Sequence, residues 1–164
     1  MEFFNDVYDS PIGYLALKAT TTHLTELKFV EKKGKVFHRN KITDETILQL
    51  NLYFNNELKQ FSLPIQPTGS DFRIKVWSVL EKIQFGELKS YKDVAKELGS
   101  IKSVRAVGLA NGDNPIVIII PCHRVIGSNN SIVGYGGGIW RKRWLIDHEN
   151  AGMQQTLFDS VNYL

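Results

Sequence analysis

The first part of the chain alternates apolar and polar residues in the manner of β-strands. Residues 12–19 and 24–30 each follow a period of two, which turns one face of a strand toward a core. Helix-start residues then appear at 43–46. The apolar positions that follow them are Ile47, Leu50, Leu52 and Phe54. The pattern predicts a small α/β unit, with strands first and a helix after them.

A short segment rich in proline and glycine separates this unit from the rest of the chain. Residues 63–69 contain Pro64, Pro67 and Gly69, which are typical of a linker. We therefore predict two domains, over residues 1–68 and 69–164. The expected fold class is α+β, with a second domain that is mainly helical.

The second domain opens with helical spacing. Asp71 is the predicted N-cap of its first helix. The apolar positions of this helix are Phe72, Val76, Trp77, Val79, Leu80 and Ile83. Further on, the unbroken apolar run 116–120 predicts a buried strand, and it is far too short to cross a bilayer.

Two short helices between these elements suggest a DNA-binding unit. Ser90 and Asp93 have capping-box spacing before a helix that Gly99 ends, and a second helix is expected over 102–111. The outer positions of that second helix include Lys102, Arg105, Ala106 and Leu109. A helix-turn-helix has this layout, and so does an ordinary helical hairpin. Small residues beside an arginine would suit close approach to a DNA groove.

Composition and charge are those of a soluble globular protein. Hydrophobic residues make up 43% and charged residues 23%, and the net charge is +3. Residues 1–70 carry eight charges of each sign, whereas residues 71–164 carry twelve basic against nine acidic ones, so an anion is expected to meet the second part. The first residues do not resemble a signal peptide, and a single cysteine favours a reducing, cytoplasmic setting.

That cysteine, Cys122, is the candidate nucleophile. A free thiol is mostly protonated at neutral pH and needs a base nearby, which His123 could supply directly or through a water. Glu149 could orient the histidine, or it could form a salt bridge with Arg124 instead. Adjacent side chains in a strand point apart, so direct contact between Cys122 and His123 would require a turn. A buried, inert cysteine is the open alternative.

These residues, with their surroundings, resemble one known family. The motifs are Asn114-Pro115, Pro121-Cys122-His123-Arg124-Val125, Gly134-Tyr135-Gly136-Gly137-Gly138 and the closing helix with Trp144-Leu145 and His148-Glu149. Upstream, Ser90-Tyr91, Arg105-Ala106-Val107-Gly108 and the helix of Trp77 also match. The stretch of about 70–150 is similar to the O6-alkylguanine-DNA alkyltransferases, whereas residues 1–70 match only in layout.

The resemblance implies a fold and a reaction. The fold would be a ribonuclease H-like N-terminal domain followed by a winged helix-turn-helix-like domain. Duplex DNA containing O6-alkylguanine would be the substrate, and Cys122 would take the alkyl group once and keep it. His123 would deprotonate the thiol, Glu149 would hold His123, and Tyr91 would protonate the leaving guanine.

The remaining implied roles concern DNA and the extruded base. Arg105 would fill the gap left by the base, and Asn114 would tie its helix to the active-site segment. The other expected DNA contacts are Ala106, Lys102, Arg124, Ser90 and Gly108. The base would meet Tyr135, Gly136, Gly137 and the backbone of Val125, and the glycines suggest a roomy pocket.

Each of these residues also has a plain structural explanation. Arg105 could be a phosphate contact, Tyr91 a core residue, Asn114-Pro115 a turn and the glycines a flexible loop. Two rival functions follow from them. One is a non-catalytic winged-helix protein with a structural cysteine, and the other is a cysteine hydrolase built on Cys122, His123 and Glu149.

Few further partners are expected. His23 and His38 are too few ligands for a structural zinc site, so neither a metal nor another cofactor is predicted. The protein is expected to be a monomer that does not bind a membrane and that associates with the nucleoid when bound to DNA. Gln154, Gln155, Leu157 and Phe158 resemble a sliding-clamp docking peptide, but short motifs have many false matches, and packing of Leu157 and Phe158 on their own domain is the favoured explanation.

Overall fold

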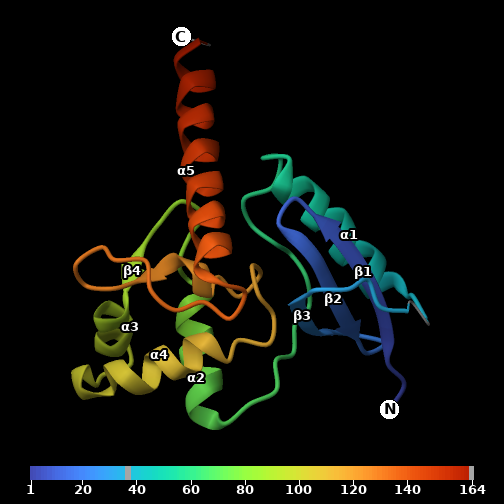
Figure 1. Cartoon of the computed structure of the whole chain (residues 1–164), viewed down its shortest axis with the longest axis horizontal. Coiled ribbons are helices and arrows are strands. Elements are labelled where there is room, and N and C mark those ends of the chain that lie inside the picture. The colour runs from blue at the N-terminus through green and yellow to red at the C-terminus, as the bar shows by residue number, and fades with distance from the viewer. Residues whose placement is uncertain (36–37, 163–164) are drawn as a thin grey trace.

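The chain forms a three-stranded sheet with one long helix, followed by a mainly helical part (Figure 1). The computed structural model describes residues 1–35 and 38–162, with side chains described as far as Gln154. The first part comprises β1 (Phe4–Ser10), β2 (Gly13–Ala19), β3 (Leu24–Val30) and α1 (Lys41–Phe54). The second comprises α2 (Asp71–Leu80), β4 (Lys89–Ser90), α3 (Tyr91–Glu97), α4 (Val104–Gly112), β5 (Val125–Ile126) and α5 (Ile139–Asn162), with 3₁₀ turns at Ile101–Ser103 and Cys122–Arg124. This architecture confirms the expected α+β class.

The sheet is an antiparallel meander in the order β1-β2-β3. Leu15, Leu17 and Ala19 of β2 are buried, while the residues between them are less so, as the alternation predicts. The sequence pattern missed β1, because this strand buries polar Asp6 and Ser10 beside Tyr8 and so lacks a clean apolar period. Helix α1 packs along the sheet and contacts each of its strands.

Helix α1 begins slightly earlier than expected. Asn40 is its N-cap and accepts a bond from the Thr43 backbone, while the Thr43 hydroxyl accepts one from the Asn40 backbone. The predicted apolar face is correct for Leu50 and Phe54, but Ile47 and Leu52 are only partly buried. The buried face of the helix turns instead toward Thr43, Thr46, Gln49, Leu50, Tyr53 and Phe54.

The helix-turn-helix expectation matches the second part closely. Ser90 and Asp93 form the capping box at the start of α3, and Gly99 ends it with a φ of 85°. A 3₁₀ turn and α4 follow and pack on α3, and β4 pairs with β5 as a short parallel ladder. One helix start was wrong by a residue: Ser70, not Asp71, caps α2 by accepting from the Arg73 backbone.

The apolar run 116–120 is not a strand. Ile116 makes a single bridge to Leu27 of β3, and the chain then turns, with Ile118 at a φ of 71°. Ile116, Ile118 and Ile120 are buried, so the run forms part of the core in a turned conformation. An unbroken run of apolar residues predicts a buried strand, because hydrophobic periodicity alone cannot distinguish a buried strand from another buried conformation.

The two parts of the chain are joined by specific contacts. Besides the bridge to β3, Arg141 of α5 donates to the Ile12 carbonyl at 2.7 Å, and His148 contacts the Tyr53 carbonyl at 2.9 Å. Residues 55–69 connect the parts without a helix or a named strand, so the boundary at 68/69 stays a prediction. Among the described residues, no helix is long and apolar enough to cross a membrane.

Candidate active site

Cys122 opens a tight 3₁₀ turn that brings the predicted catalytic residues together. The turn follows Pro121 and contains Cys122, His123 and Arg124, all of which are buried. It supplies the change of direction that a strand could not. Burial raises the pKa of the Cys122 thiol to about 11, although a hydrogen bond to Asn114 and the charge of Lys142 act in the opposite direction. The resting thiol is therefore protonated and needs a base.

His123 is held by Glu149 of α5. Its Nε2 lies 2.7 Å from Glu149 Oε2, and both side chains are almost completely buried. Burial lowers the pKa of His123, despite the opposing effect of Glu149, so the ring is neutral at pH 7. A carboxylate only accepts, so Nε2 must carry the proton and Nδ1 is left as the basic nitrogen. Nδ1 has no hydrogen-bond partner among the residues that the structure describes.

Glu149 also pairs with Arg124, so both of its predicted roles occur together. Arg124 donates from Nε to Oε1 at 2.8 Å and from Nη2 to Oε2 at 3.0 Å. Burial alone would raise the pKa of Glu149, but His123, which becomes charged in acid, and Arg124 hold it well below its usual range through their charges and hydrogen bonds. The third nitrogen of Arg124 donates to the Ile83 carbonyl. The expectation that Arg124 contacts DNA is corrected, since its guanidinium is buried and committed to these partners.

Two asparagines secure the segment that carries the cysteine. Asn114 donates to the Ile120 carbonyl at 2.7 Å and accepts from the Ile116 backbone at 2.9 Å, which closes the turn 114–120. Asn111, which the sequence analysis did not single out, lies on α4 and donates to the Cys122 carbonyl at 3.2 Å. The tie from α4 to the cysteine therefore runs directly through Asn111, and Asn114 shapes the turn between them.

Tyr91 lies at the start of α3 beside a buried lysine. Its hydroxyl donates to the Val133 carbonyl at 3.0 Å, and burial followed by the nearby Cys122 raises its pKa. Lys142 reaches the Tyr91 hydroxyl at 3.3 Å and the Val133 and Gly134 carbonyls at 2.8 and 3.1 Å. Burial lowers the pKa of Lys142 to about 8, opposed by Cys122. Lys142 was not among the predicted site residues, because the stretch Arg141-Lys142-Arg143 resembles a run of solvent-exposed charges.

A cavity of about 340 Å³ opens onto the cysteine. From the predicted residues it gathers Cys122, Asn114, Tyr135, Gly136 and Gly137, and it adds Lys28, Phe29, Asn111, Gly112, Asp113 and Val117. The Tyr135 hydroxyl is buried and unpaired within the described residues. A Cβ on Gly137 would lie 2.8 Å from the Phe29 ring, so this glycine permits close packing and does not widen the pocket.

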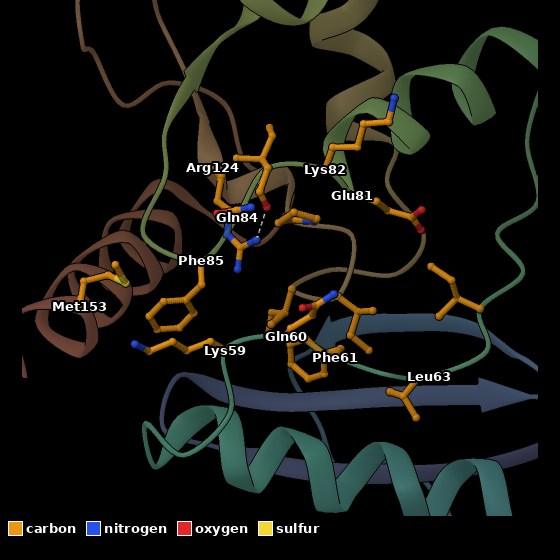
Figure 2. Close-up of a pocket in the computed structure, with 15 residues that line it drawn as sticks. Lys59, Gln60, Phe61, Leu63, Glu81, Lys82, Gln84, Phe85, Arg124 and Met153 are labelled. Atoms are coloured by element: carbon orange, nitrogen blue, oxygen red, sulfur yellow. Dashed lines mark hydrogen bonds between the residues drawn. The ribbon is translucent and has the colours of Figure 1, made fainter. Parts of the chain in front are cut away.

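A larger cavity of about 840 Å³ lies elsewhere, between residues 59–65, the 81–85 loop and the start of the 3₁₀ turn (Figure 2). Phe61, Phe85 and Arg124 face it, but Cys122 and His123 do not line it. The nucleophile therefore belongs to the smaller cavity.

The remaining predicted residues lie outside both cavities. Arg105 and Ala106 are exposed on α4, Lys102 is exposed just before it, and Gly108 is half-buried. The Ser90 hydroxyl accepts a hydrogen bond from the Asp93 backbone as the N-cap of α3. Val125 is buried and pairs with Lys89 in the short parallel ladder of β4 and β5. No group of three or more His, Cys, Asp or Glu that could hold a metal occurs in the described part of the chain.

Comparison with known proteins agrees with this arrangement. The 6-O-methylguanine DNA methyltransferase models match in two parts: the ribonuclease-like domain over residues 4–67 and the DNA binding domain over residues 71–151. The methylated-DNA–protein-cysteine methyltransferase of Mycobacterium bovis is 44% identical over 158 residues, covering 92% of this chain and 96% of its own. The enzyme of that name from Methanosarcina barkeri is 38% identical over 157 residues, covering 92% and 99%.

Solved structures give the same result. The Mycobacterium tuberculosis O6-methylguanine methyltransferase superposes with a TM-score of 0.84 at 41% identity, covering 92% of this chain and 94% of that one. Mycobacterium tuberculosis OGT in complex with DNA superposes with a TM-score of 0.83 at 42% identity, covering 89% and 92%.

Proposed function

This chain belongs to the 6-O-methylguanine DNA methyltransferase family, and on that premise we propose that it repairs O6-alkylguanine in duplex DNA by moving the alkyl group to its own Cys122. One observation carries the proposal. The thiol opens onto a cavity and is followed in sequence by a buried, neutral histidine whose Nε2 is held by Glu149. This arrangement suits a cysteine that is inert at rest and activated when a substrate arrives.

The reaction is a single displacement. His123 Nδ1 takes the thiol proton, through a bridging water, and the sulfur attacks the alkyl carbon on the side opposite O6. The carbon–O6 bond breaks, its electron pair stays with the guanine, and Tyr91 supplies the proton that the leaving guanine needs. Lys142 lies beside the Tyr91 hydroxyl and favours this proton transfer. The thioether product has no leaving route, so each molecule reacts once.

The mass of the intact protein tests this proposal. We expect incubation with a duplex containing one O6-methylguanine to add one methyl group, to stop at one equivalent, and to map to the peptide with Cys122. An undamaged duplex of the same sequence is the control. No mass gain with folded, reduced protein would leave a DNA-binding domain with a structural cysteine.

The DNA-binding surface that we propose is the exposed face of α4. A base must leave the duplex to reach the buried thiol, at a cost of a few kcal/mol, and Arg105 on that face would fill the gap. Lys102, Ala106 and Gly108 would contact the backbone around it. The flipped base would lie between Tyr135, Gly136 and the Val125 backbone.

Arg105→Ala should slow transfer from a duplex about tenfold or more, which corresponds to losing part of the compensation for unstacking. Transfer from the free base O6-methylguanine should not change, because no gap has to be filled. Lys102→Ala is the matched control. Loss of a phosphate contact should weaken DNA binding and make the DNA affinity less dependent on salt, while the extrusion of the base is unaffected. Equal losses on duplex and free base would refute the role of Arg105.

Three finer expectations stay predictions: a monomeric state, association with the nucleoid, and contact with a sliding clamp. The sliding-clamp contact through residues 154–158 falls almost entirely outside the described side chains, which end at Gln154.

A further inference from the structure

The carboxylate that holds His123 also accepts a hydrogen bond from the N-terminal domain. The Tyr53 hydroxyl of α1 donates to Glu149 Oε2 at 2.7 Å, across 96 positions of sequence. This is the same oxygen that lies 2.7 Å from His123 Nε2. Tyr53 is fully buried and Glu149 is nearly so. One carboxylate oxygen therefore joins the base to a side chain of the other domain.

Tyr53 is fixed as a donor at this position. Burial, followed by the charge of Glu149 and the hydrogen bond to it, raises the pKa of Tyr53 well above its usual value. Its ring packs against Phe61, Phe85 and His148, and His148 Nε2 contacts the Tyr53 carbonyl at 2.9 Å. The end of α1 is thus docked on α5 in one orientation, with the hydroxyl aimed at Glu149.

The hydroxyl competes with His123 for the charge of the carboxylate. Oε2 accepts from Tyr53, His123 and Arg124 Nη2, while Oε1 accepts from Arg124 Nε and the Gly86 N–H. The other titratable groups around this network are Lys142, Cys122, Tyr135 and His148. Each hydrogen bond to Oε2 spreads its negative charge, which weakens the support that Glu149 gives to a protonated His123.

We propose that Tyr53 is a positioning residue through which the N-terminal domain sets the orientation and basicity of His123. This inference rests on the proposed function, in which His123 Nδ1 deprotonates Cys122. The N-terminal domain would then influence the reaction through Tyr53, a role that its sheet alone would not suggest. It also explains why a tyrosine stands on the buried face of α1 where an apolar side chain would fill the same space.

The test compares Tyr53→Phe with Tyr8→Phe. Tyr8 of β1 is also buried in the N-terminal domain. Its hydroxyl donates to Asn51 of α1, the helix that carries Tyr53, at 2.8 Å and away from Glu149. Single-turnover methyl transfer from a duplex with O6-methylguanine is measured from pH 5 to 9, together with thermal unfolding. Tyr53→Phe should move the acidic limb of the rate profile to higher pH by roughly half a unit to one unit, because Glu149 then stabilises protonated His123 more strongly. Tyr8→Phe should lower stability and leave the limb in place.

A direct titration removes any ambiguity from a slower step. The ¹⁵N shifts of the His123 ring report its pKa without activity, and Tyr53→Phe should raise it by the same amount. If that variant does not fold, a fluorinated tyrosine at position 53 keeps the shape of the side chain. Its hydroxyl donates more strongly to Glu149, so it should lower the pKa of His123 instead. An unchanged His123 titration in the folded variant would overturn the proposal. Absence of transfer in the wild-type protein would instead remove the proposed function.

Discussion

Cys122→Ala is expected to abolish alkyl transfer while leaving the protein folded and able to bind DNA. The chain contains one cysteine, so no other thiol can take the alkyl group. The side chain is small and lines a cavity, so its loss should cost only about 1 kcal/mol of stability. Intact mass after incubation with the O6-methylguanine duplex, DNA affinity and thermal unfolding measure the three outcomes separately.

The same variant separates the rival functions. A structural cysteine in a non-catalytic DNA-binding protein predicts that the wild type transfers nothing and that Cys122→Ala is the less stable protein. A cysteine hydrolase predicts repeated turnover by the wild type, where the displacement mechanism allows one event. Cys122→Ser is the matched control, because its hydroxyl takes the place of the thiol with nearly the same shape but is a far weaker nucleophile. Methyl transfer to any other residue in Cys122→Ala would contradict the assignment of the acceptor.

Sequence reasoning succeeded where the chemistry is local or where the motif spacing is distinctive. The Ser90–Asp93 capping box depends on residues three apart, and it forms as expected. A 3₁₀ turn carries Cys122 and His123, and helix α5 carries Glu149, whose carboxylate lies 2.7 Å from His123 Nε2. Their distances from one another could not be predicted from their positions in the sequence, but the combination of a nucleophile, a base and an orienting group indicated the chemistry.

The polar side chains of the site that were misplaced or missed have a common cause, which is that the burial of a polar group depends on distant parts of the chain. Arg124 was expected to contact DNA, with a salt bridge to Glu149 as the alternative, and in the structure Glu149 and the Ile83 carbonyl both accept hydrogen bonds from it in the core. Lys142 is buried because the Val133 and Gly134 carbonyls accept from it. The Tyr53 hydroxyl has its partner in the other domain. No periodicity within one segment could have revealed these pairs.

Glu149→Gln should be the most damaging substitution that leaves Cys122 in place. The amide removes the charge that compensates Arg124, and breaking a buried ion pair by removing one partner costs about 3–5 kcal/mol. The amide can also donate to His123, which favours the tautomer with the proton on Nδ1 and removes the base. Loss of an oriented general base should slow methyl transfer by about 100-fold or more.

The pH dependence of stability separates the lost charge from lost packing. The folded-state pKa of Glu149 is depressed, so its contribution is complete above its unfolded pKa of about 4.3 and is lost as the pH falls toward the folded value. The stability gap between wild type and Glu149→Gln, measured by urea unfolding, should therefore stay constant above about pH 5 and narrow in acid. Glu97→Gln is the control: its exposed pair with Lys82, at 3.8 Å, should contribute at most about 1 kcal/mol. A gap that does not depend on pH would mean that Glu149 acts in the core by its shape and not by its charge.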